Sequence, residues 1–206
     1  MTGVTCNISV SVDGFVAGPR QSADNPIGEG GMRLHEWHFN PQGADQRVID
    51  EWQQAPGAYI MGRNMFGPGR GEWDLDWTGW WGDDPPYHAP VFVLTHHPRG
   101  PLIMDGGTVF HFVTDGLDFA LDQAKAAAGG KNVEIAGGAS TVNAYLQAGA
   151  IDELHLHIAP LLLGAGERLF DGVTAGLRLE PVQVISSPGA THVRYRVGQA
   201  PPAPPT

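Results

Sequence analysis

The chain has 206 residues, 42% of them hydrophobic, which is enough apolar side chain for one substantial core. Its formal net charge is −10 with only 12 lysines and arginines, which argues against nucleic acid as a partner. The single cysteine excludes an intrachain disulfide, and no apolar stretch suits a membrane span or a signal peptide. We therefore expect a cytoplasmic protein.

Strands and helices alternate along most of the chain. Short runs of continuous or alternating apolar residues predict strands, and apolar residues three or four positions apart predict helices. In chain order the sequence predicts a strand over residues 4–12, a helix from Asp45 that stops at Pro56, strands over 58–61, 91–94 and 108–113, a helix over 117–128, a strand over 133–136, a helix over 140–148, and strands over 154–158, 178–186 and 192–197.

This order predicts a mostly parallel sheet with helices on both faces. The last two strands are joined by the turn sequence Ser187-Pro188-Gly189, so they are expected to form an antiparallel hairpin at the sheet edge. We expect one domain over residues 1–198, followed by a disordered Pro-rich tail over residues 199–206.

Two segments show no sustained periodicity. Residues 18–31 are rich in glycine and proline and predict a long irregular connection. Residues 67–90 hold four tryptophans among glycine, proline and aspartate, which predicts a loop or flap. This Trp-rich segment either closes as a lid that excludes water or packs against a dimer partner.

Two glycines, Gly137 and Gly138, lie between a predicted buried strand and a predicted helix. Glycine lets a ligand approach the backbone, and the free N–H groups at the start of a helix favour a phosphate. The same pattern fits a tight connection in which Ser140 or Thr141 caps the helix. A phosphate site and a purely structural turn therefore both remain open.

Two other strand ends carry groups that suit a phosphate. At Gly62-Arg63 the glycine lets a ligand approach the backbone closely, and the arginine offers a guanidinium group that can bind a phosphate. Residues 95–99 gather a hydroxyl, imidazoles and a second guanidinium group that suit a phosphate, although taken alone the segment fits a solvated polar loop better.

Several known site patterns are absent. Gly164-Ala165-Gly166 does not continue as a Rossmann fingerprint, and no Walker sequence or nucleophile elbow occurs. His155 and His157 share one predicted strand face, and His35 and His38 share a helical one, but neither pair has a defined metal-ligand spacing. We expect no metal site.

Taken in order, five segments resemble the dihydrofolate-reductase-like superfamily, especially the branch that includes the reductase domain of bacterial riboflavin biosynthesis. The resemblance covers about residues 4–197 and implies a three-layer α/β/α fold with a central mostly parallel sheet and a C-terminal antiparallel hairpin. The segments that carry it are Ser11–Ala17, Met61–Phe66, Val93–His96, Ile135–Ala139 and Ile151–Pro160 with the following Leu163–Gly166.

The resemblance implies NADPH as the cofactor. The Gly-Arg segment and the Gly-Gly helix start would hold its phosphates, which assigns this role to Gly62, Arg63, Gly137, Gly138, Ala139 and Ser140. Thr95 and His96, with Arg99, would lie beside the adenosine 2′-phosphate, and Val16 and Ala17 would approach the nicotinamide.

The substrate side departs from true dihydrofolate reductases. Met65 replaces the threonine of their Gly-Arg-x-Thr motif, and their pteridine-binding carboxylate has no clear counterpart, with Glu36 the nearest substitute. Trp37 is a candidate for stacking on a flat ring, although a core tryptophan is the more frequent explanation of such a residue. Asp13 is the catalytic candidate, because it ends a strand beside the expected nicotinamide, although a turn-forming Asp13-Gly14 dipeptide explains it nearly as well.

The sequence therefore predicts an NADPH-dependent reductase that transfers a hydride to a small pyrimidine- or pterin-like heterocycle. The alternative is a protein of the same fold that binds the dinucleotide as a sensor or assembly partner without turnover. A ribosylaminopyrimidine phosphate substrate would need a second cationic cluster, for which Arg20, Arg33 and Arg70 are the candidates. Members of the riboflavin branch tend to pair, so a homodimer is expected.

Overall fold

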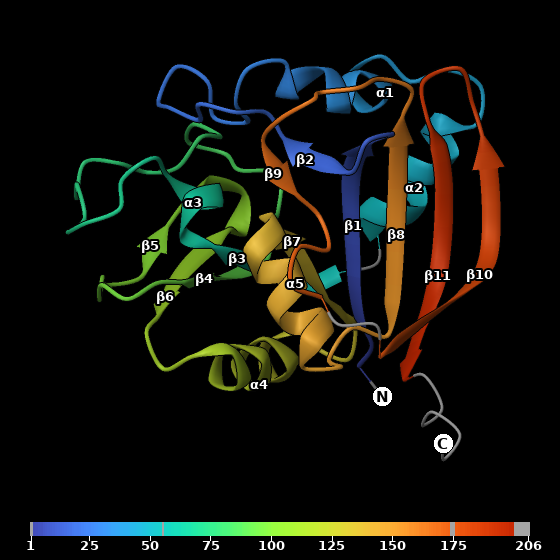
Figure 1. Ribbon diagram of the computed structural model, residues 1–206. Helices are drawn as coiled ribbons and strands as arrows, with labels where there is room; N and C mark the ends of the chain where they lie inside the picture. Colours follow the sequence, from blue (N-terminus) through green and yellow to red (C-terminus); the bar gives the residue numbers. More distant parts are fainter. Residues whose placement is uncertain (1, 55, 174–175, 200–206) are drawn as a thin grey trace, which may run out of the picture.

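The computed structural model describes residues 2–54, 56–173 and 176–199 and forms one nine-stranded sheet with helices on both faces (Figure 1). The six central strands run parallel, and only the pairs at the two edges are antiparallel. In spatial order the strands are β10 (Leu177–Ser186), β11 (Thr191–Gln199), β8 (Glu153–Ala159), β1 (Val4–Ser11), β7 (Asn132–Gly137), β3 (Pro56–Gly62), β4 (Pro90–Leu94), β6 (Val109–Val113) and β5 (Leu102–Ile103).

Helices α4 (Leu117–Ala127) and α5 (Ala139–Gln147) cover the face of the sheet that points toward the viewer in Figure 1. Their buried residues join the largest apolar cluster, which includes every second residue of β1 from Val4 to Val10. Helix α2 (Asp45–Gln54) lies behind β1 and β8, on the opposite face. The predicted three-layer fold with a terminal hairpin is confirmed.

The long predicted elements are found within a few residues of their expected positions, and Pro56, where the helix from Asp45 was expected to stop, begins β3. The short elements were not predicted, because two to five residues are too few to show a period. They are β2 (Phe15–Ala17), which pairs with β9 (Glu167–Arg168), β5, the 3-10 helices Gly31–His35 and Asp105–Gly107, and the one-turn helices α1 (Glu36–Phe39) and α3 (Arg63–Phe66).

The Trp-rich segment 67–90 is irregular, as predicted, and it packs against its own chain. Trp73, Trp77 and Trp81 lie on a second apolar cluster formed by β3, β4, β6 and Phe66. Among the described residues, no helix is long and apolar enough to cross a membrane. The predicted tail begins at the last residue of β11, and its residues 200–206 lie outside the part of the chain that the structure describes.

Candidate functional site

The C-terminal ends of β7, β3 and β4 meet at one edge of the sheet. Met61 of β3 pairs with Gly137 of β7, and Gly62 pairs with Leu94 of β4. The three segments that the sequence singled out for phosphate binding therefore lie next to one another. We call this the strand-end edge, with Gly62, Arg63, Thr95, Gly137 and Gly138 at its centre.

Helix α5 begins at this edge without a side-chain cap. Its N-cap is Gly138, in extended backbone, and the first intrahelical bond runs from Val142 N–H to the Gly138 carbonyl. The N–H groups of the first turn therefore have no intrahelical acceptor. The predicted cap by Ser140 or Thr141 is not formed, and no atom lies within 4 Å of where a side chain at Gly138 would begin.

Gly62 is required by packing. A side chain there would collide with the hydroxyl of Thr141 on α5, so the glycine lets α5 approach the end of β3. This close approach places the open first turn of α5 beside Arg63, which begins α3.

Two guanidinium groups flank Trp73 at the same edge. Arg63 stacks on the Trp73 ring at 3.8 Å from the ring centroid, and Arg99 lies 5.6 Å from it. Arg63 donates to the carbonyls of Gly69 and Glu72, and Arg99 donates to the carbonyl of Leu75. In each guanidinium one nitrogen, Nη1, is buried without a hydrogen-bond partner.

Thr95 and His96 follow β4 directly. The Thr95 hydroxyl is buried and accepts the His97 N–H at 3.1 Å, so it holds the turn in place. His96 is exposed beside it. Trp73 donates from Nε1 to the His97 carbonyl at 2.7 Å, which fastens the Trp-rich segment to this turn.

Val16 and Ala17 lie in β2, next to the C-terminal end of β1 (Figure 1), and both are buried. β2 pairs with β9, and Gly166 fits there because its φ is +133° and a side chain would collide with the Ala17 carbonyl. The Asp13 carboxylate accepts the N–H groups of Leu163 and Gly164, at 3.1 and 2.7 Å.

These bonds and the Ser11 hydroxyl fix the charge of Asp13. The Ser11 hydroxyl, with the backbone N–H groups, lowers the pKa of Asp13 to about 2. Asp13 is therefore ionised at neutral pH, where it accepts hydrogen bonds and has no proton to donate.

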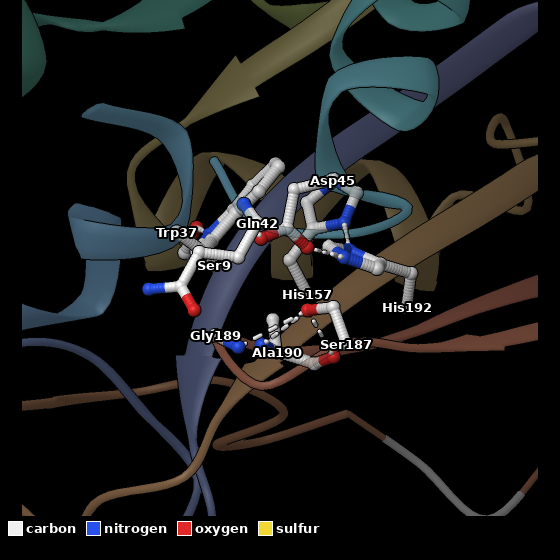
Figure 2. A network of polar contacts seen from close by, with 9 residues as sticks. All are labelled: Ser9, Trp37, Gln42, Asp45, His157, Ser187, Gly189, Ala190 and His192. Atoms are coloured by element: carbon white, nitrogen blue, oxygen red, sulfur yellow. Dashed lines mark hydrogen bonds and ion pairs between the residues drawn. The ribbon is translucent and has the colours of Figure 1, made fainter. Parts of the chain in front are cut away.

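Trp37 and Glu36, the predicted substrate residues, differ sharply in environment. Glu36 is exposed at the start of α1, whereas Trp37 is only 2% exposed. Figure 2 shows Trp37 within a polar network, where its Nε1 donates to the Ser9 hydroxyl at 3.0 Å. Its ring lies 4.5 Å from that of His157, centroid to centroid. The packing alternative therefore accounts for the position of Trp37.

A buried carboxylate does begin a helix in this region, but the helix is α2. Asp45 is fully buried, and its oxygens bind His192 Nε2 at 2.9 Å and Gln42 N–H at 2.8 Å (Figure 2). Burial acts to raise its pKa, but hydrogen bonds from Ser187, Gln42 and His192 outweigh it and lower the pKa. The sequence predicted a substrate carboxylate at Glu36, and Asp45 was not among its candidates.

Glu134 is a second buried carboxyl group that the sequence analysis did not single out. It lies on β7 and is 1% exposed, and it accepts Trp52 Nε1 at 2.7 Å and Asn7 Nδ2 at 3.0 Å. Burial raises its pKa to about 8, although the hydrogen bonds from Trp52 and Asn7 oppose this. Its signal in the sequence was a lone acidic residue between Val133 and Ile135, both apolar.

Within the described ranges, no group of three or more His, Cys, Asp or Glu side chains is placed to hold a metal ion. His155 and His157 do share one strand face, as predicted, and both line a cavity beneath α2.

The family model described as RibD C-terminal domain matches residues 2–193, almost the whole fold described above. The chain belongs to the RibD C-terminal domain family. No curated protein sequence matches the chain. The family match and the architecture place it in the riboflavin branch of the dihydrofolate-reductase-like fold.

Three solved structures illustrate the shared RibD C-terminal fold. A protein from Shewanella sp. PV-4 named for riboflavin biosynthesis is 24% identical, with a TM-score of 0.66 and coverage of 96% of this chain and 99% of that one. A diaminohydroxyphosphoribosylaminopyrimidine deaminase/5-amino-6-(5-phosphoribosylamino)uracil reductase from Thermotoga maritima is 13% identical, with a TM-score of 0.59 and coverage of 95% of this chain but 56% of that one. A pyrimidine reductase-like protein from Corynebacterium diphtheriae is 17% identical, with a TM-score of 0.55 and coverage of 97% and 93%. At these identities the similarities show the fold.

Proposed function

We propose that this protein is an NADPH-dependent reductase of a small pyrimidine- or pterin-like heterocycle. One observation carries the proposal: the uncapped first turn of α5, with open space at Gly138, lies beside Gly62 and Arg63. Such a helix start binds phosphate through free N–H groups and the helix dipole. The reductase activity named for the Thermotoga maritima protein supports the reaction class.

The residues of the strand-end edge fit the cofactor. The first turn of α5, from Ala139 and Ser140, and the guanidinium of Arg63 would bind the pyrophosphate. Arg99, with its unpartnered buried Nη1, is the proposed partner of the 2′-phosphate, and Thr95 and His96 would border it. Since NADH lacks that phosphate, Arg99 favours NADPH.

When bound, NADPH supplies a hydride from its nicotinamide ring. Val16 and Ala17 would exclude water on one side, because β2 covers the end of β1 with buried backbone. Asp13 would orient neighbouring groups as a fixed anion, and a proton for the product must come from ordered water or from the substrate side. Glu36 is exposed and stays a proposed contact with the substrate, whereas Trp37 is 2% exposed and packs within the polar network. Dihydrofolate is not the proposed substrate, because Glu36, the nearest substitute for the pteridine-binding carboxylate, is exposed at the start of α1.

The Gly138→Val variant tests the phosphate site. The added side chain would fill the open space before α5, so the rise in melting temperature caused by NADPH should fall to near zero. A thermal-shift titration with NADPH, NADH and NADP⁺ measures this, and the wild-type protein should respond more strongly to NADPH than to NADH. Gly198→Val, on the exposed end of β11, is the control and should respond like the wild type.

If wild-type protein shows no shift with any of the three nucleotides, the proposed cofactor is wrong. If Gly138→Val folds and still responds fully, the cofactor binds elsewhere.

Replacing Arg99 by glutamine tests the assignment of the 2′-phosphate. A charge-assisted hydrogen bond contributes about 1.5–3 kcal/mol, so NADPH should bind about 10- to 100-fold more weakly while NADH binding changes little. Isothermal titration calorimetry with both nucleotides measures the two affinities. Arg178→Gln, at an exposed position of β10, provides the matched control. If the affinities for NADPH and NADH fall equally, Arg99 stabilises the Trp-rich segment and does not bind the 2′-phosphate.

A second candidate function is nucleotide binding without turnover, as a sensor or assembly partner. The environments of the carboxylates favour it, since Asp13 is held by backbone N–H groups and Asp45 is buried. NADPH that binds but is not oxidised with any of a panel of pyrimidines and pterins would support this candidate. The homodimer and the cytoplasmic location stay predictions.

A further inference from the structure

A cavity of about 160 Å³ lies beneath α2, away from the strand-end edge. One side of it is the polar face of β1, β8 and β11, and Val48, Glu51 and Trp52 of α2 form the opposite wall. The strand-end edge is formed by β7, β3 and β4, and none of its five central residues lines the cavity. Since a cavity of roughly 150 Å³ can hold a molecule the size of benzene, this one has room for a small organic ligand.

Charged side chains of both signs line this cavity. They come from three elements, with Glu51 on α2, Glu153 on β8 and Arg194 on β11. His155 lies among them: it pairs with Arg194 across the strands, and its Nε2 lies 3.1 Å from Glu153 Oε2. Burial lowers the pKa of His155, and the charges of all three residues also act on it. The guanidinium and the two carboxylates therefore surround one imidazole.

The guanidinium of Arg194 has no carboxylate partner, although two carboxylates line the same cavity. Within the part of the chain that the structure describes, its side chain makes no ion pair and no hydrogen bond. Its Nε is buried, whereas Nη1 and Nη2 keep exposed surface and are open to a ligand. Two such terminal nitrogens match the two oxygens of a carboxylate. Arg194 therefore offers a place for a carboxylate group.

The opposite charge is offered by accessible oxygens. The side chain of Glu51 is 57% exposed and that of Glu153 is 39% exposed. Glu51 has only a 3.7 Å contact with Arg47, and the bond from Glu153 to His155 uses Oε2. Trp52 follows Glu51 on α2 and adds an aromatic ring, which also attracts cations. This side of the cavity therefore suits an ammonium group.

A ligand with a single charge does not match this lining. An anion at Arg194 would lie near two carboxylates, and a cation at the carboxylates would lie near the guanidinium. A ligand that carries both charges a few ångströms apart would bind both sides at once. An α-amino acid has this form, because its ammonium and carboxylate groups share one carbon neighbour, and its side chain could pack on Val48 and Ile185.

We propose that this cavity binds a small apolar α-amino acid as a zwitterion. The carboxylate accepts from the terminal nitrogens of Arg194, and the ammonium group donates to Glu51 and Glu153. Trp52 lies against the ligand, and its indole Nε1 donates to Glu134, which holds the ring in the wall. The site is independent of the proposed NADPH site and of turnover.

Isothermal titration calorimetry of the full chain with L-valine, 3-methylbutanoate and 2-methylpropylamine tests the proposal. The second compound lacks the ammonium group of valine, and the third lacks its carboxylate. L-Valine should bind with one-to-one stoichiometry and at least about tenfold more tightly than either analogue. Each analogue loses one charged contact and leaves the matching charge of the cavity unpaired.

Variants of the cavity test the two contacts separately. Arg194→Met removes the guanidinium and should weaken valine binding by about 10- to 100-fold, the loss expected for a charge-assisted hydrogen bond. Glu51→Gln and Glu153→Gln should each weaken it by about 2- to 5-fold, because these carboxylates are more exposed to solvent. Arg178→Met and Asp122→Asn make the same kinds of change at exposed positions outside the cavity and should bind valine like the wild type.

Absence of valine binding to the wild type at about 10 mM would overturn the proposal. Equally tight binding of 3-methylbutanoate or 2-methylpropylamine would overturn it too, because the cavity would then select one charge only. Full binding of valine by Arg194→Met would also contradict it, and the two glutamate variants keep the test open if Arg194→Met does not fold. The cavity variants should keep the wild-type response to NADPH, and competition between valine and NADPH would show that valine binds at the strand-end edge instead.

Discussion

Replacing Glu134 with glutamine is expected to remove a large pH dependence from the stability of the protein. Burial raises the pKa of this carboxyl from 4.5 to about 8. Between these pH values the folded state keeps a proton that the unfolded state has released. The contribution of Glu134 to stability is therefore greatest below pH 4.5 and is lost as the pH rises to about 8. At about 1.4 kcal/mol for each pH unit, the loss is on the order of 5 kcal/mol.

Urea unfolding of wild type and Glu134→Gln between about pH 4.5 and 9 measures the effect. The difference in free energy of unfolding should move in favour of the variant as the pH rises, and should level off above pH 8. His157 has a lowered pKa and acts in the opposite direction below its usual value, but it is present in both proteins and cancels. Glu36→Gln, which makes the same change at an exposed position, is the matched control. A constant difference for Glu134→Gln would show that the carboxyl is ionised in the fold.

The second large effect is expected at Trp37. Trp37→Ala removes the largest fully buried side chain and its bond to Ser9, and such replacements cost about 3–5 kcal/mol. The ring also separates His157 and His192 from solvent on the α1 side, so water should reach the polar network. Urea unfolding at neutral pH measures the loss of stability.

Trp80→Ala is the control, because Trp80 is half-buried in the irregular Trp-rich segment. It should cost about 1 kcal/mol or less. A similarly small loss of unfolding free energy for Trp37→Ala would mean that α1 does not hold the polar network in place. Trp37 would then again be a candidate for stacking on the substrate.

The sheet was predictable because its central strands are long and buried on both faces. The apolar run Val91–Leu94 predicts a strand, and the two glycines after β7 predict a junction, from the local sequence alone. Strand ends are also local, so Gly62, Arg63 and Gly137 could be named in advance and then found side by side. The pairing of β7 with β3 brings them together.

The polar face that β1, β8 and β11 share was not predictable in the same way. Asn7, His157 and Arg194 are far apart in sequence, and each alone looks like an ordinary residue of a half-buried strand. Their meeting depends on strand order and register, which single-sequence patterns do not specify. Asp45 shows the same limit: it begins a predicted helix, but its burial follows from contact with His192, which is 147 residues away.

The strand order also bears on the sequence of events during synthesis. β1 is made first, but both of its neighbours, β7 and β8, lie beyond residue 131, so its edges stay unpaired until most of the chain has left the ribosome. Pairing over such separations is slow and exposes strand edges in the meantime. The polar network of Figure 2 is completed later still, because His192 belongs to β11. The network therefore forms only after β11 has been made, and a protein shortened before β11 would keep the strand-end edge but lose the bond between His192 and Asp45.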